Sequence, residues 1–197
     1  NETKYSKNFD DAFDWVKSQD KSRPVQYERA EKEGYATEIF CPMYYSPKAC
    51  EEYATNDKNK RPLIQCEYNH TMGNSGGNLK EYWDLIRKYP KYQGGFDWDF
   101  VDQGLHRTPH FDASRSLEDY ERAAKEVNVK TEYTYGGDYN KDDPSDNNFN
   151  CNGMIGPDRQ LNPHAYEVGY EYQDIWATPV NLREGKIQVR NEYFFRN

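Results

Sequence analysis

Glu67 lies where an apolar segment of this sequence gives way to a polar loop. Residues 62–67, PLIQCE, predict a buried strand, and residues 68–77 are polar and contain three glycines. In a parallel α/β sheet the reacting groups gather at the carboxyl ends of the strands, so Glu67 is suited to act as a nucleophile or as a general acid or base. The same placement also allows a structural carboxylate that pairs with a neighbouring arginine.

Three further side chains lie at or just after expected strand ends: Tyr44, His70 and Trp98. Taken alone, a tyrosine at a strand end is more often a packing residue, a loop histidine more often caps a backbone group, and a tryptophan suits the core.

Strand and helix patterns alternate along the first half of the chain. In chain order, the spacing predicts a helix through 9–16 that 20–24 ends, an extended run at 25–27, a strand at 38–43, a helix at 47–55, a strand at 62–67, a helix through 79–86 that Pro90 stops, and a strand at 94–98. This alternation predicts a parallel sheet. Because a (β/α)8 barrel typically needs about 250 residues, a chain of 197 residues with about four such strands does not contain a complete one.

The second half is less regular. Residues 163–172 predict a final helix. Residues 106–134 predict an excursion over the mouth of the barrel, which could include an amphipathic helix through Leu117, Tyr120, Ala124 and Val127.

The last segment has the pattern of a hairpin. Residues 180–182 and 187–195 alternate around the turn at 183–186. We therefore expect one domain over 1–173 and the beginning of a second, all-β domain over 174–197.

The composition excludes several classes of partner. The net charge is -8, and acidic and basic residues alternate without the basic stripe that nucleic acid requires. No stretch approaches the roughly 20 apolar residues of a membrane span. The mean hydropathy is -1.23, which predicts a weak core, whereas aromatic residues reach 16%. We expect no nucleic acid partner and no membrane partner.

The cysteines form no CxxC pair, and two of them lie in strand-like runs: the four are Cys41, Cys50, Cys66 and Cys151. We expect free buried thiols, without a disulfide or a zinc site. Free thiols fit a reducing compartment, so a cytoplasmic location is the expectation, with a periplasmic one possible. Asn1 follows no methionine or signal-like segment, so we expect the chain to be part of a longer protein.

A long motif surrounds Glu67. Residues 61–103 are RPLIQCEYNHTMGNSGGNLKEYWDLIRKYPKYQGGFDWDFVDQ. They resemble the large bacterial β-galactosidases of glycoside hydrolase family 2, including the CEY-x-H-x-MGNS and QGGF-x-WD-x-VDQ signatures. Asn1-Glu2, SRPVQYE, CPMY, YGGD, FNCNG and NEYFF continue the resemblance, which covers nearly the whole chain except about 106–134.

This resemblance implies a fold and a pair of catalytic groups. The fold is part of a (β/α)8 TIM barrel, about strands 5 to 8, followed by the start of a β-sandwich domain. Glu2 would be the acid/base and Glu67 the nucleophile, because a retaining glycosidase uses two carboxyl groups about 5 to 5.5 Å apart. Asn1 resembles the asparagine that binds the sugar 2-hydroxyl.

The resemblance also implies the binding residues. Tyr44 resembles the tyrosine that touches the nucleophile, His70 the histidine on the sugar hydroxyls, and Trp98 the floor of the galactose pocket. Asn152 resembles a substrate-site residue that is also a sodium ligand, together with the carbonyl oxygen of Phe149.

Magnesium is the second implied ion. Glu2 resembles one of its ligands, and the partner ligands lie upstream of Asn1. The implied cofactors are therefore Mg²⁺ and Na⁺, with most of their ligands outside this chain.

Two places depart from the family pattern. Thr3-Lys4-Tyr5-Ser6 stands where small residues and glycine are common. Asp97 stands where an apolar residue is common, so it needs a partner if its charge faces inward.

Three functions remain open. The first is a retaining enzyme that removes terminal β-galactose from lactose-like β-galactosides as part of a longer protein, which in full is expected to form a homo-oligomer. The second is a catalytically inactive fragment or sugar-binding relic, and the third is a related activity such as β-glucuronidase. The isolated chain is expected to be inactive or weak, because half a barrel leaves sheet edges unpaired.

Overall fold

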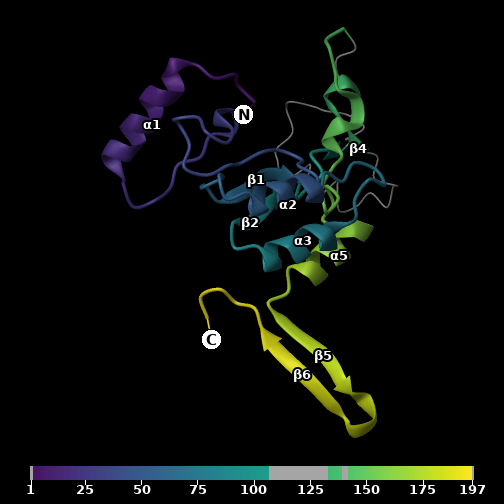
Figure 1. Cartoon of the computed structure of the whole chain (residues 1–197). Helices are drawn as coiled ribbons and strands as arrows, with labels where there is room; N and C mark the ends of the chain where they lie inside the picture. The colour runs from purple at the N-terminus through teal and green to yellow at the C-terminus, as the bar shows by residue number, and fades with distance from the viewer. Residues whose placement is uncertain (1, 107–132, 139–141, 197) are drawn as a thin grey trace.

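The computed structural model describes residues 2–106, 133–138 and 142–196 (Figure 1). Its elements are α1 (Lys7–Gln19), η1 (Glu28–Ala30), α2 (Pro47–Thr55), β1 (Leu63–Tyr68), α3 (Leu79–Lys88), β2 (Tyr92–Asp97), β3 (Leu105–His106), β4 (Tyr133–Thr134), η2 (Gly136–Asp138), η3 (Asn147–Asn150), α5 (Pro163–Glu171), β5 (Ile175–Asn181), η4 (Leu182–Glu184) and β6 (Lys186–Asn191). The helix expected through Val127 lies outside the described residues.

The four other expected helices are confirmed, and local signals explain where two of them begin and end. At the start of α2, the Ser46 side chain accepts a hydrogen bond from the Ala49 N–H at 3.3 Å, and Pro47 occupies the first turn. Asn78, with a left-handed φ of 60°, precedes α3. Pro90 follows α3 and cannot continue it.

The central pairing is parallel, between β1 and β2. On the other side of β1, the expected strand that ends at Met43 is present only as two isolated parallel bridges, Phe40 with Leu63 and Met43 with Glu67. Pro42 lies between these bridges and has no N–H to donate, so the ladder is interrupted there. The order across the sheet is still the one that consecutive barrel strands require.

The sheet continues beyond β2 into a segment from later in the chain. Val101 forms a parallel bridge with Ile155. The Asp99 N–H donates to the carbonyl oxygen of Asn152 at 2.8 Å, and the Trp98 N–H donates to that of Tyr68 at 3.0 Å. The carboxyl ends of β1 and β2 therefore meet the 149–155 segment, and this edge holds the candidate site.

The core is small, as the polar composition predicts. One buried cluster lies between α2, α3 and the sheet: Phe40, Cys50, Tyr53, Ala54, Leu63, Ile86 and Tyr92. A second one joins Tyr68 of β1 to Leu79 of α3 and Val168 of α5. The helices thus pack against the β1–β2 pair and against one another (Figure 1).

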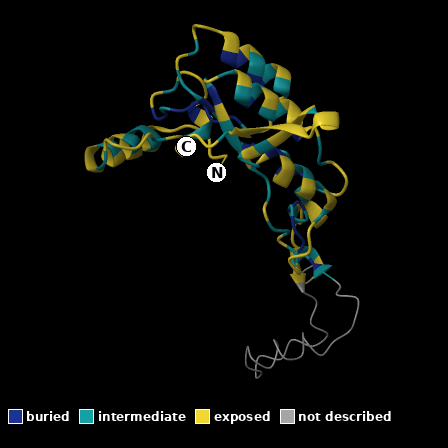
Figure 2. Cartoon of the chain, turned by 90° about the horizontal axis from the view of Figure 1, so that it is seen from below, coloured by how far each residue is buried: buried dark blue, intermediate teal, exposed yellow. Residues whose placement is uncertain are grey.

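Helix α1 differs from α2, α3 and α5 because it has no buried residue. Its apolar spacing predicts the helix correctly, but the apolar face packs only on nearby rings: Phe9 stacks on Tyr27 at 4.0 Å and Phe13 meets Tyr35 at 5.3 Å. Trp15 is 66% exposed. Most of α1 is accordingly exposed or half-buried in Figure 2.

The expected hairpin is confirmed, but its first strand is longer and ends before Leu182, and its second strand ends at Asn191 and not at 195. Strand β5 begins at Ile175, five residues before Val180, because Ile175 already pairs with Asn191 of β6. At the turn, the Asn181 side chain accepts from two backbone N–H groups, and Gly185 takes a φ of 65° that favours glycine. All of β6 is exposed.

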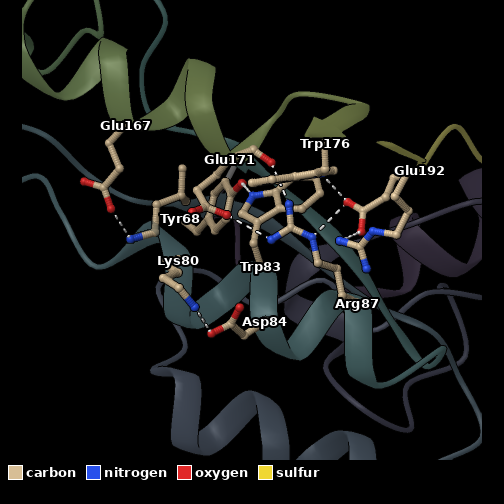
Figure 3. Close-up of polar contacts among 11 residues, drawn as sticks. Tyr68, Lys80, Trp83, Asp84, Arg87, Glu167, Glu171, Trp176 and Glu192 are labelled. Carbon is tan, nitrogen blue, oxygen red and sulfur yellow. Dashed lines mark hydrogen bonds and ion pairs between the residues drawn. The ribbon is translucent and has the colours of Figure 1, made fainter. Parts of the chain in front are cut away.

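Arg87 of α3 fastens this hairpin to the helices (Figure 3). Its guanidinium donates to Glu171 Oε2 at 2.9 Å and to Glu192 Oε2 at 3.1 Å, and the Trp176 indole N–H donates to the same Glu192 oxygen at 2.7 Å. The guanidinium also lies 5.2 Å and 4.7 Å from the ring centroids of Trp83 and Trp176. We call these five residues the Arg87 clamp.

All four cysteines are free, as predicted, but only Cys41 and Cys50 are buried, whereas Cys66 and Cys151 are half-buried. Burial raises the pKa of Cys41 and of Cys50 to about 11 and that of Cys66 to about 12. These thiols are therefore protonated and unreactive near neutral pH. Among the described residues, the helices are all too short or too polar to cross a membrane.

Candidate active site

Glu67 is buried at the carboxyl end of β1, with 8% of its surface exposed. The Tyr44 phenol donates a hydrogen bond to Glu67 Oε2 at 2.7 Å, and the Tyr44 N–H donates to the Glu67 carbonyl oxygen at 2.9 Å. Tyr44 has a φ of 52°, which is strained for a bulky side chain. The structure thus brings together the predicted nucleophile and its predicted tyrosine, and two hydrogen bonds hold the pair.

An irregularity in the pairing of β1 changes the direction in which the side chains around Glu67 point. The register with β2 shifts between Gln65 and Tyr68, so the usual alternation of faces is broken there, and both Glu67 and Tyr68 are buried. Below the shift, the Gln65 amide accepts from the Tyr45 N–H at 2.7 Å and donates to the Tyr92 hydroxyl at 2.9 Å. This fully buried amide anchors the strand and the Tyr44 turn to each other.

The Tyr44 phenol stays protonated. Burial, then the hydrogen bond and the negative charge of Glu67, raise the pKa of Tyr44 well above its usual value. A protonated phenol can only donate to the carboxylate oxygen 2.7 Å away. Tyr44 therefore orients Glu67 and stabilises negative charge on it.

His70 lies beside this pair. Its ring meets the Tyr44 ring edge to face at 5.8 Å and the Phe149 ring at 5.1 Å, and its Nε2 is 3.4 Å from the Asn152 amide nitrogen. The predicted residues Tyr44, His70, Phe149 and Asn152 thus come together from three separate segments of the chain.

Asn152 carries an unpartnered oxygen. The side chain is 1% exposed, and its amide nitrogen donates to the Phe149 carbonyl oxygen at 3.0 Å, whereas Oδ1 is buried without a hydrogen-bond partner. Thr71 holds the residue in place through a 2.6 Å bond to its carbonyl oxygen. A buried acceptor without a donor costs free energy, and amide and carbonyl oxygens suit hard cations. Phe149 and Asn152 therefore fit the sodium ion that the family resemblance implies.

Trp98 lines a cavity of about 260 Å³ together with Phe149 and Asn152. This volume is slightly below the range for drug-sized ligands, about 300 Å³ and above, which suits one sugar ring. A second hollow of about 310 Å³ lies against Tyr44, His70 and Asn69. Tyr44 and His70 therefore line one hollow, and His70 touches Phe149 and Asn152 in the wall of the other.

The second predicted carboxylate, Glu2, is exposed, and Asn1 lies outside the described residues. The Glu2 charge adds to burial and to Glu67 in raising the pKa of Tyr44, so both carboxylates act on one phenol. The backbone after Glu2 is tied down by the Tyr27 hydroxyl, which donates to the Thr3 carbonyl oxygen at 2.7 Å.

Glu28 is an acidic neighbour that the motifs do not single out. Burial raises its pKa, the neighbouring Arg29 lowers it, and the charges of Glu2 and Glu67 raise it further. The available signal is its position, since Glu28 directly follows an extended run and Glu67 lies near the carboxyl end of β1.

No described group of three or more His, Cys, Asp or Glu side chains can hold a metal. Glu2 is the described residue that the resemblance assigns to magnesium. Within the described residues, then, no complete site of that kind is present.

Asp97 has the partner that its inward charge requires. The Asn69 amide donates to Asp97 Oδ2 at 2.6 Å, across the ends of β1 and β2. Burial raises the pKa of Asp97 to about 6, the Asn69 bond lowers it and the charge of Asp99 raises it. The contact links two predicted site residues through their neighbours, because Asp97 directly precedes Trp98 and Asn69 directly precedes His70.

The fold and this strand-end site define a class of protein. Residues 1–177 match the family described as glycosyl hydrolases family 2, TIM barrel domain. The chain belongs to this family, and the match confirms the predicted fold class.

Relatives within the family share one activity in their names. The chain is 37% identical over 207 residues to the beta-galactosidase of Aeromonas hydrophila, 37% over 211 residues to that of Oenococcus oeni, and 38% over 210 residues to that of Leuconostoc mesenteroides. Each match covers 100% of this chain but only 18% or 19% of the relative.

Among solved structures, the chain is similar to b-glucuronidase from Ruminococcus gnavus in complex with D-glucuronic acid. The TM-score is 0.48 at 15% identity, over 88% of this chain and 31% of that chain.

Proposed function

We propose that this chain is part of a retaining β-galactosidase that removes terminal β-galactose from lactose-like β-galactosides. The observation that carries the proposal is the buried Glu67 carboxylate at a strand end, bonded by the Tyr44 phenol, in a family whose relatives are named beta-galactosidases. Glu67 is the nucleophile and Glu2 the acid/base.

The proposed reaction has two displacements. In the first, a Glu67 oxygen bonds to the anomeric carbon, the bond from that carbon to the leaving oxygen breaks, and Glu2 gives its proton to the leaving oxygen. In the second, Glu2 takes a proton from water, the water oxygen bonds to the anomeric carbon and the bond to Glu67 breaks. Tyr44 stays protonated throughout and holds Glu67 in line.

The sugar would lie between the cavity beside Trp98 and the hollow beside Tyr44 and His70. The indole face would stack on the ring from the first, His70 would bind hydroxyl groups from the second, and Asn1 would bind the 2-hydroxyl. Phe149 and Asn152 would hold Na⁺ through their oxygens, and Glu2 would contribute to a Mg²⁺ site. Bound there, the cations supply positive charge that orients sugar hydroxyls and Glu2.

The four free cysteines support a further proposal about location. Thiols that stay unpaired suit a reducing compartment. We place the enzyme in the cytoplasm, and a disulfide found in protein isolated from its source would contradict this.

The function is tested in a hybrid enzyme. In it, residues 1–197 replace the matching segment of the Leuconostoc mesenteroides beta-galactosidase, since that relative aligns with the whole chain. We expect the hybrid to hydrolyse a chromogenic β-galactoside far faster than the matching β-glucuronide, and the isolated chain to show little or no turnover. A correctly assembled hybrid without galactosidase activity, or one that prefers the glucuronide, would overturn the proposal.

A further inference from the structure

One hydrogen bond joins the two strand ends that carry the proposed site. Asn69 follows β1 and Asp97 ends β2, and the Asn69 amide donates to Asp97 Oδ2 at 2.6 Å. In the parallel register Asp97 is the partner of Tyr68, the residue between Glu67 and Asn69. The bond therefore joins the carboxyl ends of β1 and β2 two residues after the proposed nucleophile.

The turn that this bond holds is strained. Asn69 has a φ of 52°, a left-handed conformation that asparagine tolerates better than most residues but that still costs free energy. The turn lies between Glu67, bonded to Tyr44, and His70, packed on Phe149. A strained backbone conformation persists only where its surroundings hold it. Here the Asp97 carboxylate holds the turn by accepting the hydrogen bond of the Asn69 amide.

The strength of the bond depends on the charge of Asp97. A carboxylate accepts a stronger hydrogen bond from an amide than a carboxylic acid does. The second oxygen, Oδ1, is buried without a hydrogen-bond partner. Burial raises the pKa of Asp97 to about 6, with a further rise from Asp99.

Apart from the Asp99 carboxylate, the polar groups named around Asp97 are neutral. The phenols of Tyr68 and Tyr172 share a 2.6 Å hydrogen bond, and the Asp97 charge helps to raise the pKa of each, after burial. Both phenols therefore stay protonated from pH 4 to pH 9, since their ordinary pKa is already about 10. Asp97 is thus the group in this cluster whose charge changes near pH 6.

We propose that Asp97 is a positioning residue that, through Asn69, fixes the turn between Glu67 and His70, and that its ionised form holds the turn in the sugar-binding arrangement. Asp97 does not touch the sugar in this account. The proposal rests on the proposed function, because His70 is the group that the turn presents to the substrate.

The kinetic test uses two variants of the hybrid enzyme. In Asp97→Val the bond to Asn69 is lost, and we expect KM for the chromogenic galactoside to rise about 10-fold, with a smaller fall in kcat. In Asp97→Asn the amide oxygen can still accept, so most of the KM should be recovered. The rise in KM on acidification through pH 6, expected in the parent, should be absent from both variants.

Two kinetic results would overturn the proposal. One is an Asp97→Val variant whose KM and pH profile match those of the parent. The other is an Asp97→Asn variant that keeps the rise in KM near pH 6, because that titration would then belong to another group.

A second measurement does not depend on activity. The Tm values of the 197-residue chain, of Asn69→Ala, of Asp97→Val and of the double variant form a cycle that isolates the coupling between the two side chains. We expect clearly non-additive Tm shifts at pH 8 and smaller non-additivity at pH 4. Additive shifts at pH 8 would contradict the proposed bond. A hybrid that folds but does not hydrolyse galactosides would instead refute the proposed function, whatever this cycle shows.

Discussion

Two parts of the molecule bury carboxylates, and they surround them differently. At the strand ends, Glu67 accepts a hydrogen bond from the Tyr44 phenol, and Asp97 accepts one from the Asn69 amide. In the Arg87 clamp, the buried Glu171 accepts from the Arg87 guanidinium at 2.9 Å (Figure 3). The two donors named at the strand ends are a neutral phenol and a neutral amide, whereas the donor to the clamp acid is a cation.

This difference separates reacting groups from fastening groups. A guanidinium neutralises a carboxylate and gains from both charge and geometry, so it suits a joint between elements. A neutral donor orients a carboxylate but leaves its charge available for attack on an electrophilic carbon or for a proton. The strained φ values at Tyr44 and Asn69 lie in the first region, where rigid placement of the acids matters for chemistry.

The largest expected effect is on turnover. Glu67→Gln in the hybrid enzyme should lower kcat by about 10⁴-fold or more, because an amide cannot form the glycosyl-enzyme. Glu171→Gln is the matched control, since it also neutralises a buried glutamate, and should keep most of the activity. Equal losses in the two variants, measured with a chromogenic galactoside, would remove the distinction between the regions.

The next largest effect is on stability. Arg87→Leu should lower the free energy of unfolding by about 2 to 3 kcal/mol, because it leaves the buried Glu171 without its cation and the half-buried Glu192 with Arg190 in place of two cations. Lys80→Leu on the same helix is the control: its ion pair with Asp84 is exposed, and such pairs add little. Urea unfolding of the chain compares the two. Equal midpoints for both variants would mean that the clamp does not fasten the hairpin.

Tyr44→Phe should affect catalysis more than stability. Losing the phenol O–H removes one donor from Glu67, and removal of one such donor typically costs about 10²-fold in kcat. Tyr45→Phe removes the neighbouring hydroxyl and should leave kcat near that of the parent. Unchanged kcat in Tyr44→Phe would show that the hydrogen bond does not act on the nucleophile.

The smallest expected effect is on folding stability, and it depends on pH: Asp97→Asn should stabilise the chain at high pH and not at low pH. The folded-state pKa of Asp97 is raised from 3.8 to about 6, so stability from this group is full below pH 3.8 and is lost as the pH rises through 6. Asp97→Asn should therefore stabilise the chain at pH 8 by about 1 kcal/mol, after allowance for solvent screening, and should not do so at pH 3.8.

Glu171→Gln should change the stability at pH 8 in the opposite direction from Asp97→Asn. It breaks an ion pair and should destabilise the chain there. Thermal unfolding of both variants at the two pH values measures the difference. A loss of stability at pH 8 in Asp97→Asn would contradict the unfavourable burial of the Asp97 charge.

Elements marked by local signals were predictable from sequence. The bounds of α2 follow from Ser46 and Pro47, and α3 stops before Pro90. The spacing that predicts α1 does not say whether anything covers its apolar face, and the structure leaves that face largely exposed. Burial depends on partners distant in sequence, so periodicity alone does not determine it.

The pairing of distant residues was less predictable. The Asn69–Asp97 bond depends on the parallel register of β1 and β2 and on its shift after Gln65, and neither has a local signal. The interruption at Pro42 could have been expected, because a proline cannot donate to a ladder. The Arg87 clamp joins side chains up to 105 positions apart, beyond the reach of any local pattern.

The site itself was predicted mainly from motifs. The motifs name Glu67, Tyr44, His70 and Asn152, and the structure brings these four together. The SRPVQYE motif ends at Glu28 and the CEY-x-H motif leaves Asn69 open, and neither assigns a role, because the importance of both residues comes from neighbours that only the folded chain supplies.

The central claim is that Glu67 is the nucleophile, and covalent trapping tests it most directly. The hybrid enzyme is incubated with a 2-deoxy-2-fluoro β-galactoside that carries a good leaving group, then digested, and its peptides are sequenced by mass spectrometry. We expect one fluorogalactosyl group on Glu67 and none in Glu67→Gln. Labelling of another residue, or turnover without any trapped adduct, would contradict the account.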